Sequence, residues 1–353
     1  MRGVDRYLAL PLQTACEAVN GLSSAEEARA RMLGSIARIG RELAGAMAFA
    51  QLFTGHKPAL VVLPEYVLTG FPMGESIEGW WDKAAVDMDG PEYDALAGLA
   101  ADAGVHLAGN LYERDPAFAP LYFQTCFIIA PSGDVVLRYR RLISMFAPTP
   151  YDVWDKYLDL YGLDGVLPVA RTEIGALAAI ASEEILYPEI ARALAVRGAE
   201  VLCHPTSEIA SVLQTKKDVA RIARAQENLA CVVSANTAGI TGTPVPAAST
   251  DGKSQVVDHH GHVLSKADSG PSVAGQALVD LAALRAERRT PGMNNLLVRS
   301  GVKLFPGGDD KAGWVPAGAL LADDGSVRVP DRAHFAAVQP AIIQRLIDAG
   351  VLG

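Results

Sequence analysis

Residues 180–207 read IASEEILYPEIARALAVRGAEVLCHPTS, and this stretch decides the fold class. It begins at the end of an apolar run, 175–182, whose lack of alternating polar residues is typical of a strand covered on both faces. Pro188 then suits a first helical position, Gly198 suits a helix end, and residues 199–207 read as the next strand. A strand, a helix and a strand in this order predict a layered α/β protein.

The same alternation continues on both sides of this stretch. Strands are predicted at 7–15, 59–65, 105–113 and 231–239, helices after Ser24, at 92–103 and at 216–230, and hairpins around Gly133 and Gly261. Further along the chain the periodic pattern weakens, and Pro, Gly and Asp accumulate. We therefore expect one α/β domain over residues 1–290 and a C-terminal extension, 291–353, that wraps the core or a neighbouring subunit.

The amino-acid composition and the net charge exclude some classes of binding partner. The chain has 353 residues, of which 50% are hydrophobic, and its net charge is −9. A negatively charged chain is a poor ligand for nucleic acid or an anionic membrane, so neither is expected as a partner. The four cysteines are widely spaced and show no metal-binding pattern, and the N-terminus has no long apolar segment. These features are typical of free thiols in a cytoplasmic protein.

Three histidines close together, His259, His260 and His262, raise the question of a metal site. Adjacent residues of a strand point to opposite faces, so only His260 and His262 could share one face if the strand continues here. No second group of ligands is evident beside them. The sequence therefore predicts a solvated hairpin turn and no metal ligands.

Three polar side chains stand directly after predicted strands. Glu65 and Ser182 each end an apolar run, and Arg141 follows the second strand of a hairpin. Side chains at strand ends leave the sheet but stay anchored by it, and the ligands of layered α/β proteins gather there. We therefore expect an acid, a guanidinium and a hydroxyl to meet in one pocket.

The order and spacing of these positions resemble the nitrilase superfamily of carbon–nitrogen hydrolases. Pro64-Glu65 matches the context of the family's glutamate, and Tyr139-Arg140-Arg141 matches its Tyr-Arg-Lys context, while Ser182 stands at the position of its cysteine. The further matches are Glu184 to Glu189, Arg192, Gly198 to Glu200, Pro205 to Ser207, Arg224 to Asn228 and Val233 to Asn236. Together the matches cover residues 7–285.

This resemblance implies a four-layer α-β-β-α sandwich with one pocket at the strand ends of two facing sheets. It also implies a homodimer or larger homo-oligomer, a small amide-type substrate and no cofactor. In the family, the cysteine attacks the carbon of an amide or nitrile, the glutamate moves protons, and the lysine stabilises the tetrahedral intermediate. By position, these roles fall to Ser182, Glu65 and Arg141.

Three more residues are candidates for binding the substrate. The family carries an auxiliary glutamate shortly after its lysine, and Asp152 is the candidate for that role here. Glu184 matches an acidic family position that bonds backbone near the site. His204 ends the predicted strand 199–207 and is the histidine nearest to Ser182 among these motifs.

Two loops, 66–90 and 142–165, are expected to set the substrate specificity. Their aromatic residues indicate a partly apolar, enclosed pocket. These aromatic residues are Trp80, Trp81, Tyr151, Trp154 and Tyr157. No motif of the chain identifies the substrate itself.

The two substituted family positions leave the function open between three alternatives. A hydroxyl is far less acidic than a thiol and needs a stronger base, while arginine keeps the positive charge of lysine but does not release a proton. The chain is either an amidase-like hydrolase that uses Ser182, or a non-catalytic relative that binds a small amide or carboxylate or acts as an assembly subunit. The third alternative is a laboratory serine variant of a cysteine enzyme. Arg141 argues against it, because a variant made to trap a reaction intermediate changes one residue, and here the lysine position differs as well. The hydrolase is favoured because the surrounding motifs, Glu65 included, are intact.

Overall fold

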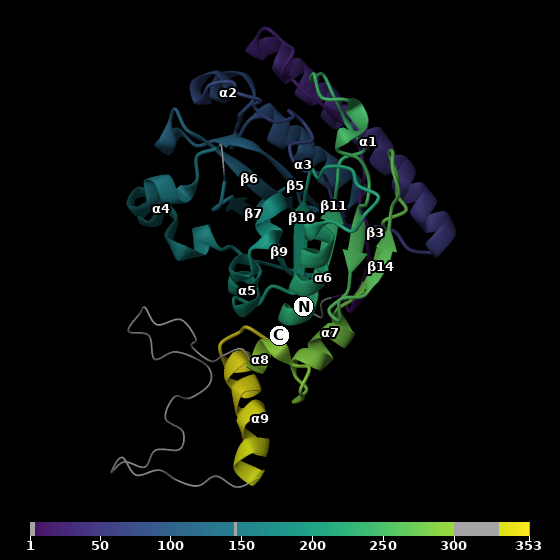
Figure 1. Cartoon of the computed structure of the whole chain (residues 1–353), viewed down its shortest axis with the longest axis vertical. Helices are drawn as coiled ribbons and strands as arrows, with labels where there is room; N and C mark the ends of the chain where they lie inside the picture. Colours follow the sequence, from purple (N-terminus) through teal and green to yellow (C-terminus); the bar gives the residue numbers. More distant parts are fainter. Residues whose placement is uncertain (1–3, 145–146, 300–331, 353) are drawn as a thin grey trace.

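Two mixed β-sheets packed against each other form the centre of the molecule (Figure 1). The computed structural model describes residues 4–144, 147–299 and 332–352, the side chains of 332–335 excepted. The first sheet contains, in spatial order, β15 (Ala277–Asp280), β1 (Arg6–Pro11), β3 (Pro58–Val62), β5 (His106–Arg114), β6 (Tyr122–Ile129) and β7 (Val135–Arg140), with β4 (Val86–Asp87) beside β5. The second contains β14 (Val263–Lys266), β13 (Gln255–Val257), β11 (Cys231–Ala235), β10 (Val201–Pro205), β9 (Gly175–Ala179) and β8 (Ala170–Thr172), and a small separate sheet pairs β12 (Ile240–Thr241) with β2 (Cys16–Glu17).

The central strands of each sheet run parallel. They are β1, β3 and β5 in the first sheet and β9, β10 and β11 in the second. The predicted hairpins, β6–β7 and β13–β14, are antiparallel, and each forms one edge of its sheet. The chain after β3 meets the chain after β10, because the N–H of Glu65 donates to the carbonyl of Thr206 at 3.2 Å. Residues that follow strands of the two sheets are therefore brought to one end of the sandwich.

Helices cover the outer faces of both sheets, which gives the predicted four-layer order. Within the described residues, the helices of the chain, including those that lie elsewhere, are α1 (Ala25–Thr54), α2 (Ile77–Lys83), α3 (Pro91–Ala103), α4 (Trp154–Val166), α5 (Pro188–Val196), α6 (Lys216–Asn228), α7 (Leu281–Arg288), α8 (Leu296–Arg299) and α9 (Arg332–Asp348). The α1 helix buries Met32, Ile36 and Ile39 against Val61 of the first sheet, because their spacing of three and four residues puts them on one helix face. The α5 and α6 helices pack on the second sheet.

One continuous apolar cluster contains residues of both sheets. Ala9, Val62 and Ala108 enter it from the first sheet, and Cys203 and Val233 enter it from the second. All four cysteines are buried and free, as expected from their spacing. Across the described ranges, none of the helices combines the length and the apolar character that crossing a membrane requires.

The structure differs from the predicted strand over 175–182. The β9 strand ends at Ala179, and Ser182 begins a short 3-10 helix, η3 (Ser182–Leu186), with a φ of +45°. The other 3-10 helices are η1 (Pro116–Phe118), η2 (Pro150–Val153) and η4 (Ala247–Ser249). A left-handed backbone is costly for a residue with a Cβ, and such residues cluster at functional sites. This turn takes the Ser182 side chain out of the sheet.

The predicted C-terminal extension is described in part. The α8 and α9 helices pack on each other through Val298 and Leu346, and Leu297 packs on Leu229 of the core. Residues 300–331 lie outside the described residues. The described parts of the extension therefore lie against the domain, while its contact with a neighbouring subunit stays a prediction.

A partly buried ion pair joins the second sheet to α7. Glu200 is 5% exposed, and its carboxylate accepts the N–H of Ala176 at 2.9 Å and two donors of Arg285 at 2.6 and 2.9 Å. Burial by itself raises the pKa of Glu200, but the Arg285 guanidinium and the Ala176 N–H outweigh it, so the pKa lies below its ordinary value.

We expect Glu200→Gln to lower the free energy of unfolding by about 2 kcal/mol at pH 7, because the charged acceptor of two guanidinium donors is lost. The folded pKa of Glu200 lies below the unfolded value of about 4.3, so this stabilisation is complete above that value and is lost as the pH falls further. Urea unfolding of both proteins at pH 7 and pH 3.5 measures the difference. The exposed Glu189→Gln is the matched control, with an expected change within about 0.5 kcal/mol. An equal cost at both pH values would contradict this account.

Candidate active site

Glu65 follows β3 after Leu63 and Pro64 and has no exposed surface. Its Oε1 accepts a hydrogen bond from Gln124 Nε2 at 2.6 Å, and its Oε2 accepts the N–H of Ser207 at 3.0 Å. Arg141 Nη1 lies 3.6 Å from Oε1 and supplies the opposite charge. A buried carboxylate is tolerated only when it is paired and hydrogen-bonded, and here both conditions are met.

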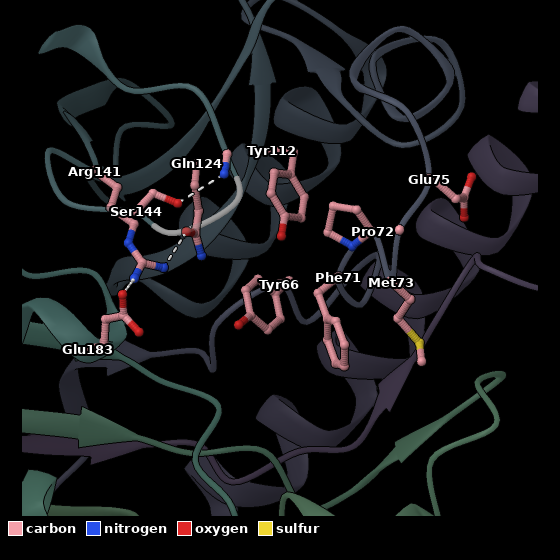
Figure 2. A pocket seen from close by; sticks show the side chains of 12 residues that line it. Tyr66, Phe71, Pro72, Met73, Glu75, Tyr112, Gln124, Arg141, Ser144 and Glu183 are labelled. Atoms are coloured by element: carbon pink, nitrogen blue, oxygen red, sulfur yellow. Dashed lines mark hydrogen bonds and ion pairs between the residues drawn. The ribbon is translucent and has the colours of Figure 1, made fainter. Parts of the chain in front are cut away.

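Arg141 lies between two carboxylates at the end of the β6–β7 hairpin. Nε donates to the carbonyl of Ile143 at 2.6 Å. Nη1 donates to Gln124 Oε1 at 2.8 Å, and Nη2 forms an ion pair with Glu183 (Figure 2). Burial opposes the charged form, but Glu65 and Glu183 outweigh it and raise the pKa of Arg141. The guanidinium is therefore a permanent cation whose charge two acids already balance.

The Ser182 hydroxyl contacts a lysine that the sequence analysis missed. Lys217 Nζ lies 2.8 Å from Ser182 Oγ and 3.1 Å from Thr206 Oγ1, and the two hydroxyl oxygens are 3.3 Å apart. Lys217 is the second residue of α6, where Thr215 caps the helix. A cation in the first helical turn interacts unfavourably with the helix dipole. This placement is the sequence signal that could have identified Lys217 as a candidate functional residue.

Burial lowers the pKa of Lys217 below its ordinary value, while Glu65 acts in the opposite direction. Removal from water disfavours the ammonium, so a larger fraction of Lys217 is free amine at a given pH. A free amine at hydrogen-bond distance from a hydroxyl can accept its proton. The site thus combines a hydroxyl, an amine, a carboxylate and a guanidinium.

Glu184 is buried behind these groups and orders the chain around Arg141. Its Oε1 accepts the N–H groups of Leu142 and Ile143 at 2.8 and 2.9 Å, and its Oε2 accepts the hydroxyl of Tyr139 at 2.7 Å. Burial raises the pKa of Glu184 to about 7 despite these donors. These hydrogen bonds hold the loop after β7, and Glu184 does not line the cavity beside Arg141.

His204 and Asp152, the other two predicted substrate-binding residues, also bond the protein. The buried His204 ring bonds the carbonyl of Ser182 through Nε2 and the hydroxyl of Ser234 through Nδ1, both at 2.8 Å. Burial, and then nearby cations, lower the pKa of His204, so the ring is neutral and holds the Ser182 backbone. Asp152 is exposed and accepts both the N–H and the hydroxyl of Thr149 at 2.8 Å, within its own turn. The structure therefore groups His204 with Ser182 and leaves Asp152 in a separate capping motif.

A cavity of about 580 Å³ opens in front of Arg141 (Figure 2). Its lining comes largely from the two predicted specificity loops, but from other residues than the aromatics named above; Trp80, for example, is fully buried in the core. The lining residues are Tyr66, Phe71, Pro72, Met73, Gly74, Glu75, Tyr112, Gln124, Arg141, Ser144, Ala147 and Glu183. Tyr66 and Glu183 directly follow Glu65 and Ser182 in the chain, so the cavity adjoins the grouped residues.

A family model for carbon-nitrogen hydrolases matches residues 19–289, and the chain belongs to this family. A formamidase of Bacillus cereus is 29% identical over 185 residues, which cover 52% of this chain and 51% of the formamidase. A bifunctional nitrilase/nitrile hydratase of Lupinus angustifolius is 29% identical over 171 residues, covering 44% of this chain and 46% of that protein. The chain thus spans about half the length of the curated relatives it matches.

Solved structures share the fold over most of the chain. A nitrilase-superfamily protein of Saccharomyces cerevisiae matches with a TM-score of 0.61 at 17% identity, covering 83% of this chain and 97% of that one. An amidase from Nesterenkonia sp. matches with a TM-score of 0.53 at 20% identity, covering 80% and 91%. These similarities confirm the predicted α/β fold of the nitrilase type.

We expect Glu184→Gln to become more stable relative to the wild type as the pH rises from 5 to 8, by on the order of 2 kcal/mol. The folded pKa of about 7 lies above the unfolded value of about 4.3, so the wild type is stabilised by Glu184 at low pH and loses this contribution as the pH rises. Glutamine is neutral throughout, its oxygen still accepts the N–H groups of Leu142 and Ile143, and its amide still bonds Tyr139. Urea unfolding at both pH values measures the change.

Glu184→Ala serves as the control that removes every acceptor. Its expected cost is about 3 kcal/mol at pH 5, because three buried donors lose their partner. A glutamine variant that is destabilised equally at pH 5 and pH 8 would show that Glu184 is ionised over the whole range.

Proposed function

We propose that the protein hydrolyses the carbon–nitrogen bond of a small neutral amide, with Ser182 as the nucleophile and Lys217 as the base that activates it. The observation that carries the proposal is the distance of 2.8 Å between Lys217 Nζ and Ser182 Oγ. A serine hydroxyl needs a base within hydrogen-bond reach, and serine–lysine pairs meet this need on unrelated folds. Membership of the carbon-nitrogen hydrolase family supports the reaction class.

The proposed reaction has two stages. The free Lys217 amine takes the proton of Ser182 Oγ while this oxygen bonds to the amide carbon, and the carbonyl electron pair moves to the carbonyl oxygen. Collapse of the tetrahedral adduct breaks the C–N bond, and the Lys217 ammonium gives its proton to the departing amine. Water then attacks the acyl ester of Ser182, again with Lys217 as base, which releases the carboxylic acid and restores the hydroxyl.

Glu65 and Arg141 act in this scheme through their charges. Glu65 raises the pKa of Lys217 against the effect of burial, so it stabilises the ammonium that forms when Ser182 loses its proton. Arg141 borders the cavity and stabilises the negative oxygen of the adduct. This refines the sequence-based assignment of Glu65 as the general base, since Lys217 takes the proton and Glu65 balances the resulting charge.

The cavity wall supports a neutral substrate with an apolar acyl group. Tyr66 and Tyr112 contribute stacked rings, with centroids 5.9 Å apart. The charge of Arg141 is balanced by Glu65 and Glu183, so a substrate carboxylate would add a third permanent anion around one guanidinium, whereas the negative oxygen of the adduct is transient. Repulsion between like charges therefore disfavours a substrate that carries a carboxylate.

Replacing the proposed base is expected to remove the activity. Lys217→Met and Lys217→Arg should each lower kcat/KM by about 10²–10⁴-fold, since methionine removes the base and arginine keeps the charge without accepting a proton. Ser182→Ala should abolish turnover while the protein still folds. Hydrolysis of a panel of small aliphatic and aromatic amides measures the rates, and mass spectrometry of the intact protein detects an acyl group on Ser182.

The exposed neighbour Lys216 supplies the matched control, because Lys216→Met keeps the same helix and the same change of residue type. Wild-type activity in Lys217→Arg would make Lys217 a positioning residue, and turnover in Ser182→Ala would exclude Ser182 as the nucleophile. Saturable amide binding by the wild type without turnover or acylation would favour the non-catalytic binding protein.

The substrate class has a separate test. Pentanamide is expected to have a kcat/KM at least about tenfold above that of succinamate, which has a similar length and a terminal carboxylate. Glu183→Gln removes one of the anions around Arg141 and should shift this ratio toward succinamate, whereas the exposed Glu189→Gln should leave it unchanged. A wild type that prefers succinamate would assign Arg141 to carboxylate binding.

A further inference from the structure

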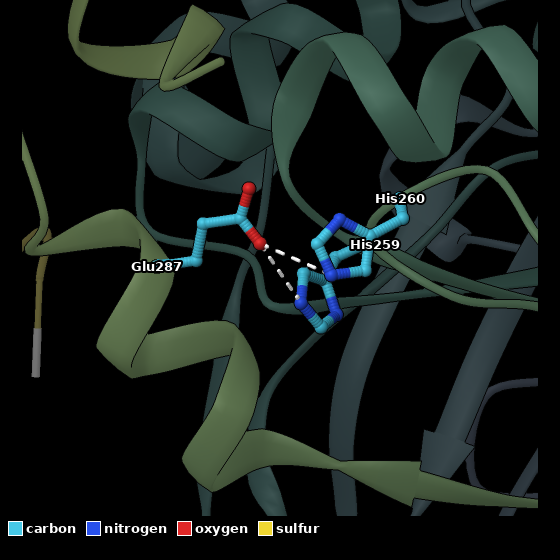
Figure 3. A group of neighbouring side chains, drawn as sticks. All are labelled: His259, His260 and Glu287. Carbon is cyan, nitrogen blue, oxygen red and sulfur yellow. Dashed lines mark ion pairs between the residues drawn. The ribbon is translucent and has the colours of Figure 1, made fainter. Parts of the chain in front are cut away.

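Two histidines and a glutamate from separate elements meet beside the second sheet (Figure 3). His259 and His260 lie in the turn between β13 and β14, and Glu287 lies in α7. His259 Nε2 is 3.2 Å and His260 Nε2 is 3.3 Å from the same atom, Glu287 Oε2. The sequence predicted a hairpin turn here, as found, but only His260 and His262 were considered as partners on one face, and there was no sign of Glu287, which comes from α7.

The two histidine-to-glutamate separations, 3.2 and 3.3 Å, match the edges of a tetrahedral metal site. Bonds of about 2.0–2.2 Å from zinc to nitrogen and oxygen, at tetrahedral angles, place neighbouring ligand atoms about 3.4 Å apart. The three candidate ligand atoms all lie within 4.8 Å of one another. The two imidazole rings lie side by side, with centroids 4.2 Å apart and planes inclined by 37°. One ion could therefore contact both rings and the carboxylate without a large rearrangement.

The nitrogen of His259 that faces this cluster has no hydrogen-bond partner among the described residues. The His259 side chain is buried, with 5% of the residue exposed, and Nε2 points toward Glu287 without hydrogen-bond geometry. Buried polar atoms are nearly always paired, and an unpaired one costs on the order of 1–3 kcal/mol. A metal ion at the shared position would satisfy this nitrogen.

Other contacts hold both ligand-bearing elements in place. Asp258 Oδ1 accepts the N–H groups of His260 at 3.0 Å and His262 at 2.8 Å, which fixes the turn. Arg288, the last residue of α7, donates to the carbonyl of Leu229 at 2.8 Å and anchors the helix. The geometry of the cluster is therefore set before any ion binds, as a metal site requires.

We propose that His259, His260 and Glu287 bind a divalent transition-metal ion, for which zinc is the best match. Two imidazole nitrogens and one carboxylate oxygen suit zinc, and three protein ligands leave a fourth position for water. The His260 side chain is 49% exposed, so the ion reaches the site from solvent. The bound ion ties the β13–β14 turn to α7, a role that does not depend on the proposed hydrolase activity.

The test measures zinc bound to the full chain without a polyhistidine tag. Isothermal titration and elemental analysis after gel filtration should give one zinc ion per chain, and zinc at about 100 times its dissociation constant should raise the melting temperature by about 3 °C. Glu287→Gln and His260→Ala should each weaken binding at least about tenfold and remove the thermal shift. His259 is left unchanged because its replacement in the buried position would disturb folding.

His262→Ala is the matched control, since His262 lies in the same turn and contacts Asp258 instead of Glu287. It should bind zinc as the wild type does. Three results would overturn the proposal: no saturable binding, full binding in Glu287→Gln or His260→Ala, or loss of binding in His262→Ala. Destabilisation of Glu287→Gln without zinc binding by the wild type would assign the cluster to ion pairing alone.

Discussion

A buried carboxylate without contact to water needs hydrogen-bond donors and a positive charge from the protein in place of its hydration. The Glu65 carboxylate is such a group, and its partners organise this end of the sandwich. Its partners come from separate parts of the fold: Gln124 from β6, Arg141 from the end of β7, and the Ser207 N–H from the chain after β10. Satisfying one buried acid therefore sets the position of one sheet relative to the other. The same contacts place the guanidinium beside the cavity.

In the proposed mechanism, stabilisation of charge and transfer of protons are divided between two cationic residues. Arg141 keeps its positive charge at every accessible pH and is held by Glu65 and Glu183. Lys217 is partly desolvated, contacts the hydroxyl of Ser182 and has a lowered pKa, so it can exchange a proton. In the proposed mechanism, this division compensates for a hydroxyl that is far less acidic than a thiol.

The α7 helix connects the domain to the C-terminal extension, and several polar contacts fix it to the second sheet. Arg285 pairs with the buried Glu200, Arg288 bonds the carbonyl of Leu229, and Glu287 faces the two histidines of the β13–β14 turn. These contacts lie on neighbouring residues of one short helix. A metal ion at Glu287 would add a third link between α7 and the second sheet, beside the contacts of Arg285 and Arg288.

The sequence alone determined the alternation of strands and helices, because apolar periodicity and helix caps act over short stretches of chain. The four-layer order and the choice of Glu65, Arg141 and Ser182 as site positions came from the resemblance to the nitrilase superfamily. Only the tertiary structure decided which groups touch the hydroxyl. Lys217 lies 35 residues after Ser182 in the chain and reaches it across the space between η3 and α6, a contact that no local pattern encodes. In the same way, the ring directions of His259 and His260 depend on a turn and on a helix that arrives later in the chain. Local pattern predicts elements, whereas contacts between distant side chains follow from how those elements pack.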